Sequence, residues 1–331
     1  MKRHDNGFVL VNALVLVAAL SALVILLLGR AELGRQSLQA GQDTQSMDMA
    51  LDSAEALALH LLYRDRQNAE AWDHPGEAWA QPWRNLPLDG IDSPFATAAP
   101  GPLSGWHLTG GLRDEQALFN LNWLTRPAED SLHAAFDRLL ERQGIASTAA
   151  TAIRAYLQPG GPSERSAYQQ PPLPRDPVGG ALFSMAQLDD ITALSDRDRA
   201  RLRPLVTVLP GDSQINVNTL GPDLLAALLP DVPPAQQASI LANRSRQPFT
   251  SVEAFLSALG LNEAAATTAG LSPDRLSIES QWMSLTAHLT RSNTTREPTA
   301  DPARSATRQA LIWRAPAPLA PEIKWRRSRF D

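Results

Sequence analysis

Residues 7–28 read GFVLVNALVLVAALSALVILLL, an apolar run without a charged side chain. A short basic leader precedes the run, and Arg30 and Glu32 close it. At ~1.5 Å per residue, Phe8–Leu28 forms a helix of roughly 32 Å, which matches the ~30 Å hydrocarbon core of a bilayer. The sequence therefore predicts one membrane-spanning helix. The basic leader favours a cytoplasmic N-terminus, with the bulk of the chain on the other side of the membrane.

A secretory signal peptide is the first alternative for this run. Such a peptide has an apolar core of about 7–15 residues and a small-residue cleavage site. The run here is longer, and the helical pattern continues beyond it. Apolar residues recur at steps of three and four, as on one face of an amphipathic helix: Met47, Leu51, Ala54, Ala58 and Leu61. We therefore predict one long helix from Phe8 to about Arg64, whose second half uses these five residues for contacts with partner helices.

This arrangement resembles the type IV pilin and pseudopilin family. The resemblance implies that prepilin peptidase cuts between Gly7 and Phe8 and that the new N-terminus, Phe8, is methylated. Most members carry glutamate at the fifth mature position, where this chain has Asn12. The minor pseudopilin K family of type II secretion typically lacks that glutamate. A carboxylate in an apolar surrounding is costly unless it is paired, and a subunit at a filament tip has no neighbour above it to supply the partner.

Composition excludes several classes of function. The chain has a net charge of −5, from 30 basic and 35 acidic residues, which does not favour binding to nucleic acid or to an anionic lipid surface. It contains no cysteine, so it has no disulfide framework, no thiolate nucleophile and no cysteine-ligated metal.

The middle of the chain contains an internal duplication. The stretch DEQALFNLN at 114–122 and the stretch INVNT at 215–219 share an apolar-Asn-apolar-Asn core. Apolar-periodic helices follow each stretch, at 132–144 and 148–157 and again at 223–229 and 234–244. Segments that begin at Phe183 and Phe249 then close the two copies, and a Pro/Gly-rich loop at 159–180 lengthens the first one. This pattern predicts an all-α domain of two SAM-like or helix-hairpin-helix-like units, which the K family also has.

Helix-hairpin-helix units that bind nucleic acid offer backbone N–H groups to a phosphate. The corresponding stretch here is Pro230–Pro234, whose three prolines lack that donor and whose Asp231 repels phosphate. From Phe119 to Leu276 the chain has 13 arginines, no lysine and 16 acidic residues. These features argue against DNA binding by the duplicated domain.

Strand patterns flank the duplicated domain. Residues 106–109 and 112–119 surround Gly110-Gly111, which predicts a hairpin. Met283–Thr290 alternates apolar and polar residues, as in a half-buried antiparallel strand. Gln309–Arg314 is its expected partner, Glu322–Trp325 is a shorter strand, and 291–308 is an exposed loop. We expect an α+β fold in the following order: a leader at 1–7, the long helix at 8–66 with its membrane span at 8–28, a first part of a pilin-like head at 67–118, the inserted α-domain at 119–276, and the second part of the head at 277–331.

Signals for catalysis and metal binding are weak. The six histidines are scattered, and no Gly-rich phosphate loop or nucleophile elbow occurs. Asp189-Asp190 and the aspartates at 196 and 198 could ligate a hard cation, but the arginines beside them favour a solvated, mixed-charge helix. The resemblance leaves open a structural Ca²⁺ ion without assigning its ligands. A tryptophan series at 72, 79 and 83 is expected to lie on the sheet, with an exposed partner-binding patch as the alternative.

The resemblance implies a non-enzymatic minor pseudopilin that initiates and caps the tip of the type II secretion pseudopilus and so contributes to export across the outer membrane. The resemblance implies an inner-membrane location, with the bulk of the chain periplasmic. It implies the minor pseudopilins I, J and H, the major pseudopilin G and prepilin peptidase as partners, and no nucleic acid. A membrane-anchored DNA receptor with helix-hairpin-helix units is the alternative, and a signal-anchored periplasmic enzyme is a third hypothesis.

Overall fold

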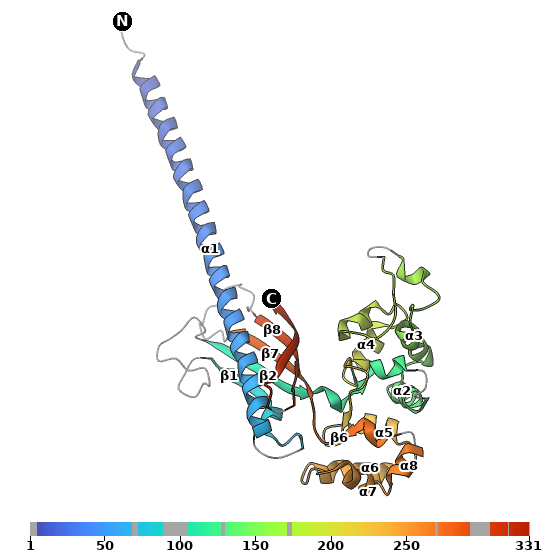
Figure 1. The fold of residues 1–331 in the computed structure, drawn as a ribbon. Coiled ribbons are helices and arrows are strands. Elements are labelled where there is room, and N and C mark those ends of the chain that lie inside the picture. Colours follow the sequence, from blue (N-terminus) through green and yellow to red (C-terminus); the bar gives the residue numbers. More distant parts are fainter. Residues whose placement is uncertain are drawn as a thin grey trace.

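The computed structural model describes residues 5–67, 72–88, 105–126, 130–170, 174–268, 271–291, 305–316 and 318–330. Figure 1 shows a long helix, a sheet beside the C-terminal half of that helix, and a helical domain to one side. The long helix, α1, runs from Asp5 to Gln67. The α+β fold with a long N-terminal helix and an antiparallel sheet is confirmed.

The head is built on a five-stranded antiparallel sheet of order β1-β2-β7-β8-β9. Its strands are β1 (Trp83–Pro87), β2 (Trp106–Asp114), β7 (Trp282–Arg291), β8 (Ser305–Trp313) and β9 (Glu322–Phe330). β2 and β7 are neighbours in the sheet, although residues 115–281 lie between them in sequence. The helical domain is therefore inserted between two adjacent strands of the head.

One face of the sheet covers the C-terminal half of α1. Successive residues of a strand face opposite sides of the sheet, so every second residue of β7 points toward α1. The inward set is fully buried and consists of Met283, Leu285, Ala287 and Leu289. The alternating set of Ser284, Thr286 and His288 lies on the outer face, so the half-buried strand is confirmed.

The prediction of a hairpin at Gly110-Gly111 is wrong. Both glycines lie inside β2, which continues through them and pairs with β7 along its whole length. Both have φ of +147°, a conformation that favours glycine. A Cβ on Gly110 would lie 1.9 Å from the carbonyl oxygen of Thr286. The pair therefore serves the close approach of two strands and not a turn.

The inserted domain has its own hydrophobic core, separate from that of the head. Its helices are α2 (Asp130–Arg142), α3 (Ser147–Leu157), α4 (Asp196–Leu202), α5 (Pro222–Leu228), α6 (Pro234–Arg244), α7 (Val252–Ala258) and α8 (Glu263–Thr268). Four two-residue strands form two parallel pairs, β3 (Phe119–Asn120) with β4 (Val206–Thr207) and β5 (Ile215–Asn216) with β6 (Leu276–Ser277).

The duplication is visible in the hydrogen bonds of the paired asparagines. In the first copy, Asn122 donates from its side chain to the carbonyl of Leu182 and accepts from the N–H of Leu182. In the second copy, Asn218 makes the same two bonds to Phe249. Each buried amide thus satisfies a loop backbone that would otherwise be left without partners.

These bonds shift the expected alignment of the two copies by one residue. Leu182, and not Phe183, is the structural equivalent of Phe249. The next equivalent pair agrees, because Ser184 and Ser251 each cap the helical turn that follows. Leu182 is 3% exposed. Phe183 is 84% exposed and is left outside the core of the repeat.

Candidate functional site

Within the described part of the chain, no other segment covers the N-terminal half of α1. Among the described residues, α1 is the one helix that is long and apolar enough to cross a membrane. Its large apolar side chains are exposed along the span, with Leu14 and Ile25 each 70% exposed. Gly7, Phe8 and Asn12 lie in the first turns of this helix, but their side chains fall outside the described part of the chain. The processing site therefore stays a prediction.

The C-terminal half of α1 corrects the predicted partner-contact stripe. Four of the five residues are buried against the sheet of the same chain: Met47, Leu51, Ala54 and Ala58. Leu61 is partly buried against the same core. The helical periodicity did identify a buried face, but the chain's own head covers it. A periodic stripe in a sequence does not say which surface it meets.

The face of α1 that remains free carries a different set of residues. Met49 is 48% exposed and Tyr63 is 40% exposed, and Ala56 lies between them on the same side of the helix. Sequence reasoning missed this row because only Met49 and Tyr63 in it are large and apolar. Leu38, eleven residues before Met49 and so on the same side of the helix, is also exposed.

A buried arginine attaches α1 to the sheet. Arg308 points inward from β8 and is 2% exposed. Its guanidinium donates to three carboxylates on successive turns of α1: Asp48, Asp52 at 2.7 Å and Glu55 at 2.8 Å. Glu55 is itself 3% exposed and accepts a second bond from Arg326 of β9. Because a buried charge is costly without partners, this network fixes where the helix crosses the sheet.

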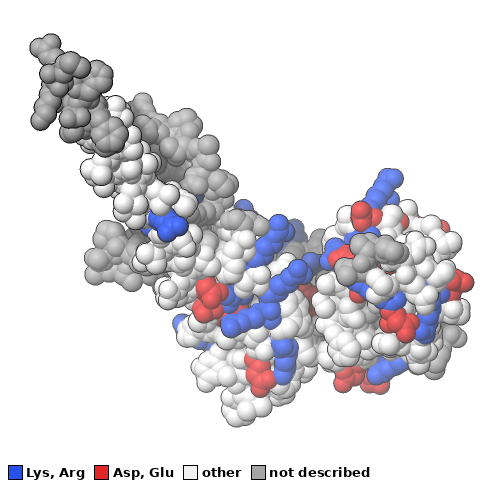
Figure 2. All heavy atoms as spheres, turned by 90° about the horizontal axis from the view of Figure 1, so that it is seen from above, with Lys and Arg blue, Asp and Glu red and all other residues white. Residues whose placement is uncertain are grey.

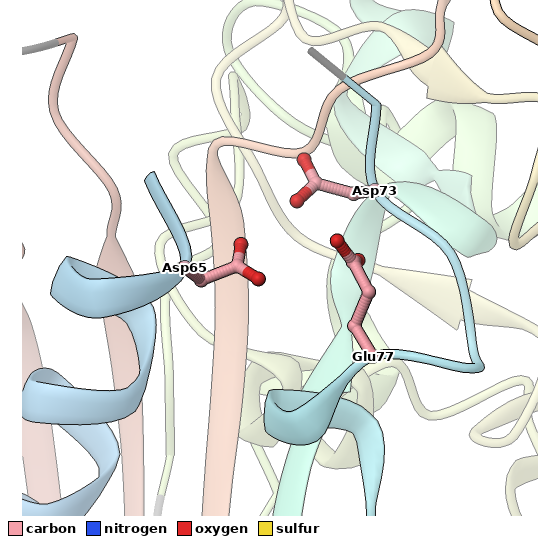
Figure 3. A group of neighbouring side chains, drawn as sticks. All are labelled: Asp65, Asp73 and Glu77. Carbon is pink, nitrogen blue, oxygen red and sulfur yellow. The ribbon is translucent and has the colours of Figure 1, made fainter. Parts of the chain in front are cut away.

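A second buried arginine lies where the head meets the inserted domain. Figure 3 shows the carboxylates of Asp65, Asp73 and Glu77 pointing toward one another from the end of α1 and the segment that follows it. Their oxygens lie within 4.8 Å of one another, an arrangement that a hard cation could use. Arg314 donates to Asp65 at 2.7 Å and also to Asp73. Its guanidinium therefore already supplies the positive charge between these two carboxylates.

The third carboxylate, Glu77, is held by neutral donors. It accepts from the backbone N–H of His74 at 2.8 Å and from the indole N–H of Trp79 at 2.7 Å. Burial raises the pKa of Glu77 to about 7, and the negative charges of Asp65 and Asp73 add to this effect. No ligands for Ca²⁺ were assigned from the sequence, and the group of carboxylates formed here was not predicted.

Asp114, the last residue of β2, connects the head to the inserted domain. It is 4% exposed and accepts from the N–H of Gln116, from the hydroxyl of Ser280 and from the hydroxyl of Thr219. Burial raises its pKa to about 6, against the opposing effect of these hydrogen bonds. Asp114 is the first residue of the DEQALFNLN signature, which identified the segment but not this role.

Two further buried amides complete this joint. Asn216 of the second copy donates to the carbonyl of Asp73 at 3.1 Å and to the hydroxyl of Ser280 at 2.7 Å. Gln116 donates to the carbonyl of Gln214 and accepts from the N–H of Gln281. Polar groups of the head and of the insert thus satisfy one another. A satisfied buried network of this kind holds one relative orientation, because moving either part would leave polar groups unpaired.

Asp114→Asn is expected to change how stability depends on pH. The folded chain keeps the proton of Asp114 up to about pH 6, whereas an unfolded aspartate releases it near pH ~4. Stability is therefore lost as the pH rises from about 4 to about 6 and stays lost above that range. The asparagine variant should gain, relative to the wild type, on the order of 1–3 kcal/mol between pH 4.5 and pH 7.5.

Denaturant unfolding at both pH values checks this expectation. Asp231→Asn removes an exposed aspartate of the insert and serves as the control. An equal change in the two variants would show that the environment of Asp114 is not the cause.

The remaining candidate residues have structural roles. Trp79 and Trp83 are buried in the core of the head, as expected for side chains that lie on the sheet. His288 is exposed on the outer face and bonds the hydroxyl of Thr307. Asp189 pairs with Arg203 at 2.7 Å, which agrees with a mixed-charge surface rather than a cation site.

The hairpin between α5 and α6 is closed by its own side chains. Gln237 is 8% exposed and donates to the carbonyls of Leu229 and Val232. The segment 230–234 also contains three prolines, so it offers few N–H groups to a phosphate. The geometry gives no support to the DNA-receptor alternative.

Comparisons with known proteins agree with this architecture. Two family profiles, both described as "Type II secretion system (T2SS), protein K", match residues 117–211 and 215–274. The chain is 32% identical over 275 residues to the type II secretion system protein K of Pseudomonas aeruginosa, which covers 77% of each protein. The chain belongs to the type II secretion system protein K family. It is therefore a minor pseudopilin, with the pilin-like fold and the apolar N-terminal helix that were expected.

More distant relatives extend the comparison. The type II secretion system protein K of Pectobacterium carotovorum subsp. carotovorum is 24% identical over 278 residues, with 76% of this chain and 79% of the relative covered. A chain from the crystal structure of the GspK-GspI-GspJ complex of enterotoxigenic Escherichia coli superposes with a TM-score of 0.67 at 22% identity. The match covers 88% of this chain and 98% of that one, which shows that the fold is shared. Members of the protein K family are structural components of the type II secretion system.

Proposed function

We propose that this pseudopilin initiates and caps the tip of the type II secretion pseudopilus, without enzymatic activity, and so contributes to export across the outer membrane. The observation that carries the proposal is the inserted domain, which projects sideways from the axis of α1 (Figure 1). The buried network around Asp114 and Asn216 holds it in one orientation. A fixed projection of this kind leaves no room for another subunit to stack above it.

The anchoring end fits the same role. We infer that prepilin peptidase cuts before Phe8, that Phe8 is methylated, and that the span at 8–28 holds the chain in the inner membrane with its bulk in the periplasm. Asn12 supplies no carboxylate to a neighbour above, which a tip subunit does not need. The solved relative was crystallised as a GspK-GspI-GspJ complex. We propose the corresponding minor pseudopilins I and J as partners here, with pseudopilins H and G joining below them.

The topology of the sheet suggests how to test the cap. Asp114 of β2 lies opposite Met283 of β7, so a two-residue Asn-Gly turn can replace residues 115–282 and close a hairpin. When the major pseudopilin is overexpressed, the shortened protein should give longer or more numerous pseudopili in electron micrographs. It should still associate with pseudopilins I and J. Retained association with unchanged pseudopilus length would contradict the capping mechanism.

The free face of α1 gives a second test, of partner binding. Met49→Asp should weaken association with pseudopilins I and J while leaving the circular dichroism spectrum unchanged, because Met49 is 48% exposed. Leu51→Asp, two residues away, should instead unfold the head, because Leu51 is fully buried and a charge there costs several kcal/mol. If Met49→Asp leaves association unchanged at tens of micromolar, partners use another surface.

A further inference from the structure

The outer edge of β9 is open among the described residues. β9 is the last strand of the sheet, and its other edge pairs with β8 from Ala306 to Trp313. In the part of the chain that the structure describes, no strand pairs with the outer edge. An open edge presents backbone N–H and C=O groups in the spacing that another strand needs.

The charge of β9 selects what can pair there. The strand has four basic residues and one acidic one, in a chain whose net charge is −5. These are Glu322, Lys324, Arg326, Arg327 and Arg329. Figure 2 shows a group of Lys and Arg side chains on the head, where it adjoins the inserted domain. Antiparallel pairing with a second copy of β9 would place like charges opposite one another, which is unfavourable, whereas an acidic strand would meet complementary charges.

A cleft with aromatic walls adjoins this edge. It has a volume of about 340 Å³ and lies between the outer face of the sheet and the inserted domain. Trp325 of β9, 38% exposed, and Phe183 of the insert, 84% exposed, both line it. The repeat does not need Phe183, because Leu182 fills the equivalent core position. Large exposed aromatic side chains in a cleft are typical anchors for a partner.

The cleft is preformed. Arg113 of β2 donates to the carbonyl of Pro204 in the insert at 2.7 Å, beside the cleft. The buried network at Asp114 also links the sheet to the insert, and residues of both line the cleft. Binding to such a site costs little ordering of the protein. Arg327 lies two residues from Trp325, so its side chain projects from the same outer face.

We propose that β9 binds an extended, acidic segment of a partner polypeptide as a sixth strand, with an apolar side chain of that segment in the cleft between Trp325 and Phe183. The backbone edge supplies the hydrogen bonds, and the two aromatic residues hold the apolar side chain. Arg327 on the outer face selects acidic sequences, because Lys324 and Arg326 already pair with Glu322 and Glu55. This inference is independent of the tip-capping role, which rests on the bulk and orientation of the insert.

The test uses the full chain in detergent micelles and a fluorescein-labelled nine-residue peptide. It has valine at its centre, glutamate at the other odd-numbered positions and threonine at the even-numbered ones, so that the valine and the glutamates share one face of a strand. Fluorescence anisotropy at low ionic strength should show binding, and the peptide with lysine in place of glutamate should bind at least about tenfold more weakly. Two further peptides are N-methylated on either the odd-numbered or the even-numbered residues. Since alternate residues of a strand point their N–H groups to one edge, only one of these two peptides should lose binding.

Three variants of the chain complete the experiment. Arg327→Glu should weaken binding about tenfold through charge repulsion, and Phe183→Ala should weaken it about fivefold through loss of the apolar contact. Arg84→Glu makes the same charge change on an exposed residue of β1, the opposite edge strand, and should leave binding unchanged. The proposal is overturned if the acidic peptide does not bind, if both methylated peptides bind as well as the parent, or if Arg84→Glu and Arg327→Glu weaken binding equally.

Discussion

Arg308→Ala should lower the free energy of unfolding of the head by about 3–5 kcal/mol, which is the usual cost of removing one partner from a buried ion pair. Arg308 is 2% exposed and donates to Asp48, Asp52 and Glu55, three acidic residues on successive turns of α1. Without it, Glu55 stays buried with less compensation. We expect the loss to appear as a lower denaturation midpoint, measured by tryptophan fluorescence.

Arg326→Ala is the matched control for Arg308. It removes a bond to the same carboxylate, Glu55, but from a side chain that is 57% exposed. Because Arg326 is exposed, water and salt screen its side of the pair, and Glu55 keeps its bond to Arg308, so the loss should be only about 1 kcal/mol. Equal losses in the two variants would show that burial of Arg308 is not what makes its ion pairs important.

Gly7→Leu should abolish maturation. The family resemblance implies that the peptidase recognises glycine before the cut, and a leucine side chain is too bulky for a site shaped around glycine. Co-expression of the wild-type chain with prepilin peptidase should yield a protein that begins with methylated Phe8, whereas the variant should keep Met1. Mass analysis of the N-terminus distinguishes the two products directly.

Gly29→Leu provides the control within the same helix. Apart from the helix's own backbone, a Cβ at Gly29 has no described atom of the chain within 4 Å, so this change should leave both the helix and its processing intact. A wild-type product that begins near Arg30, or that keeps Met1 in the presence of the peptidase, would contradict the pseudopilin type of processing. In that case the N-terminal helix would be a cleaved signal or a simple anchor.

Patterns with a fixed period were read correctly from the sequence. The long helix was expected over residues 8–66 and is observed over 5–67. Its apolar run at 8–28 can satisfy its backbone in a membrane only as a helix. The alternation in Met283–Thr290 gave a half-buried strand, and the helix at Pro234–Arg244 was placed at the observed bounds. In each case the local pattern leaves one secondary structure that buries the apolar side chains.

Signals with two physical meanings were misread. Gly110-Gly111 was interpreted as a turn, but its glycines allow the backbone of β7 to approach closely. The stripe of Leu51 and Ala58 on α1 was assigned to partner helices, but the head's own sheet covers it. Phe183 was aligned with Phe249, but the hydrogen bonds of Asn122 place Leu182 there. Sequence spacing cannot say which of two surfaces lies opposite a residue.

The sequence by itself determined the anchor, the duplication and the family resemblance, because each depends on residues close together in the chain or on a repeated motif. Only the tertiary structure decided the buried network between the head and the insert and the open edge of β9. Arg308 meets carboxylates some 250 positions earlier, and Ser280, in the segment just before β7, meets Asp73 and Asp114. The spacing of charged and polar residues along the chain does not indicate which residues they will bond. Their partners are therefore decided only when the sheet brings these distant segments into contact.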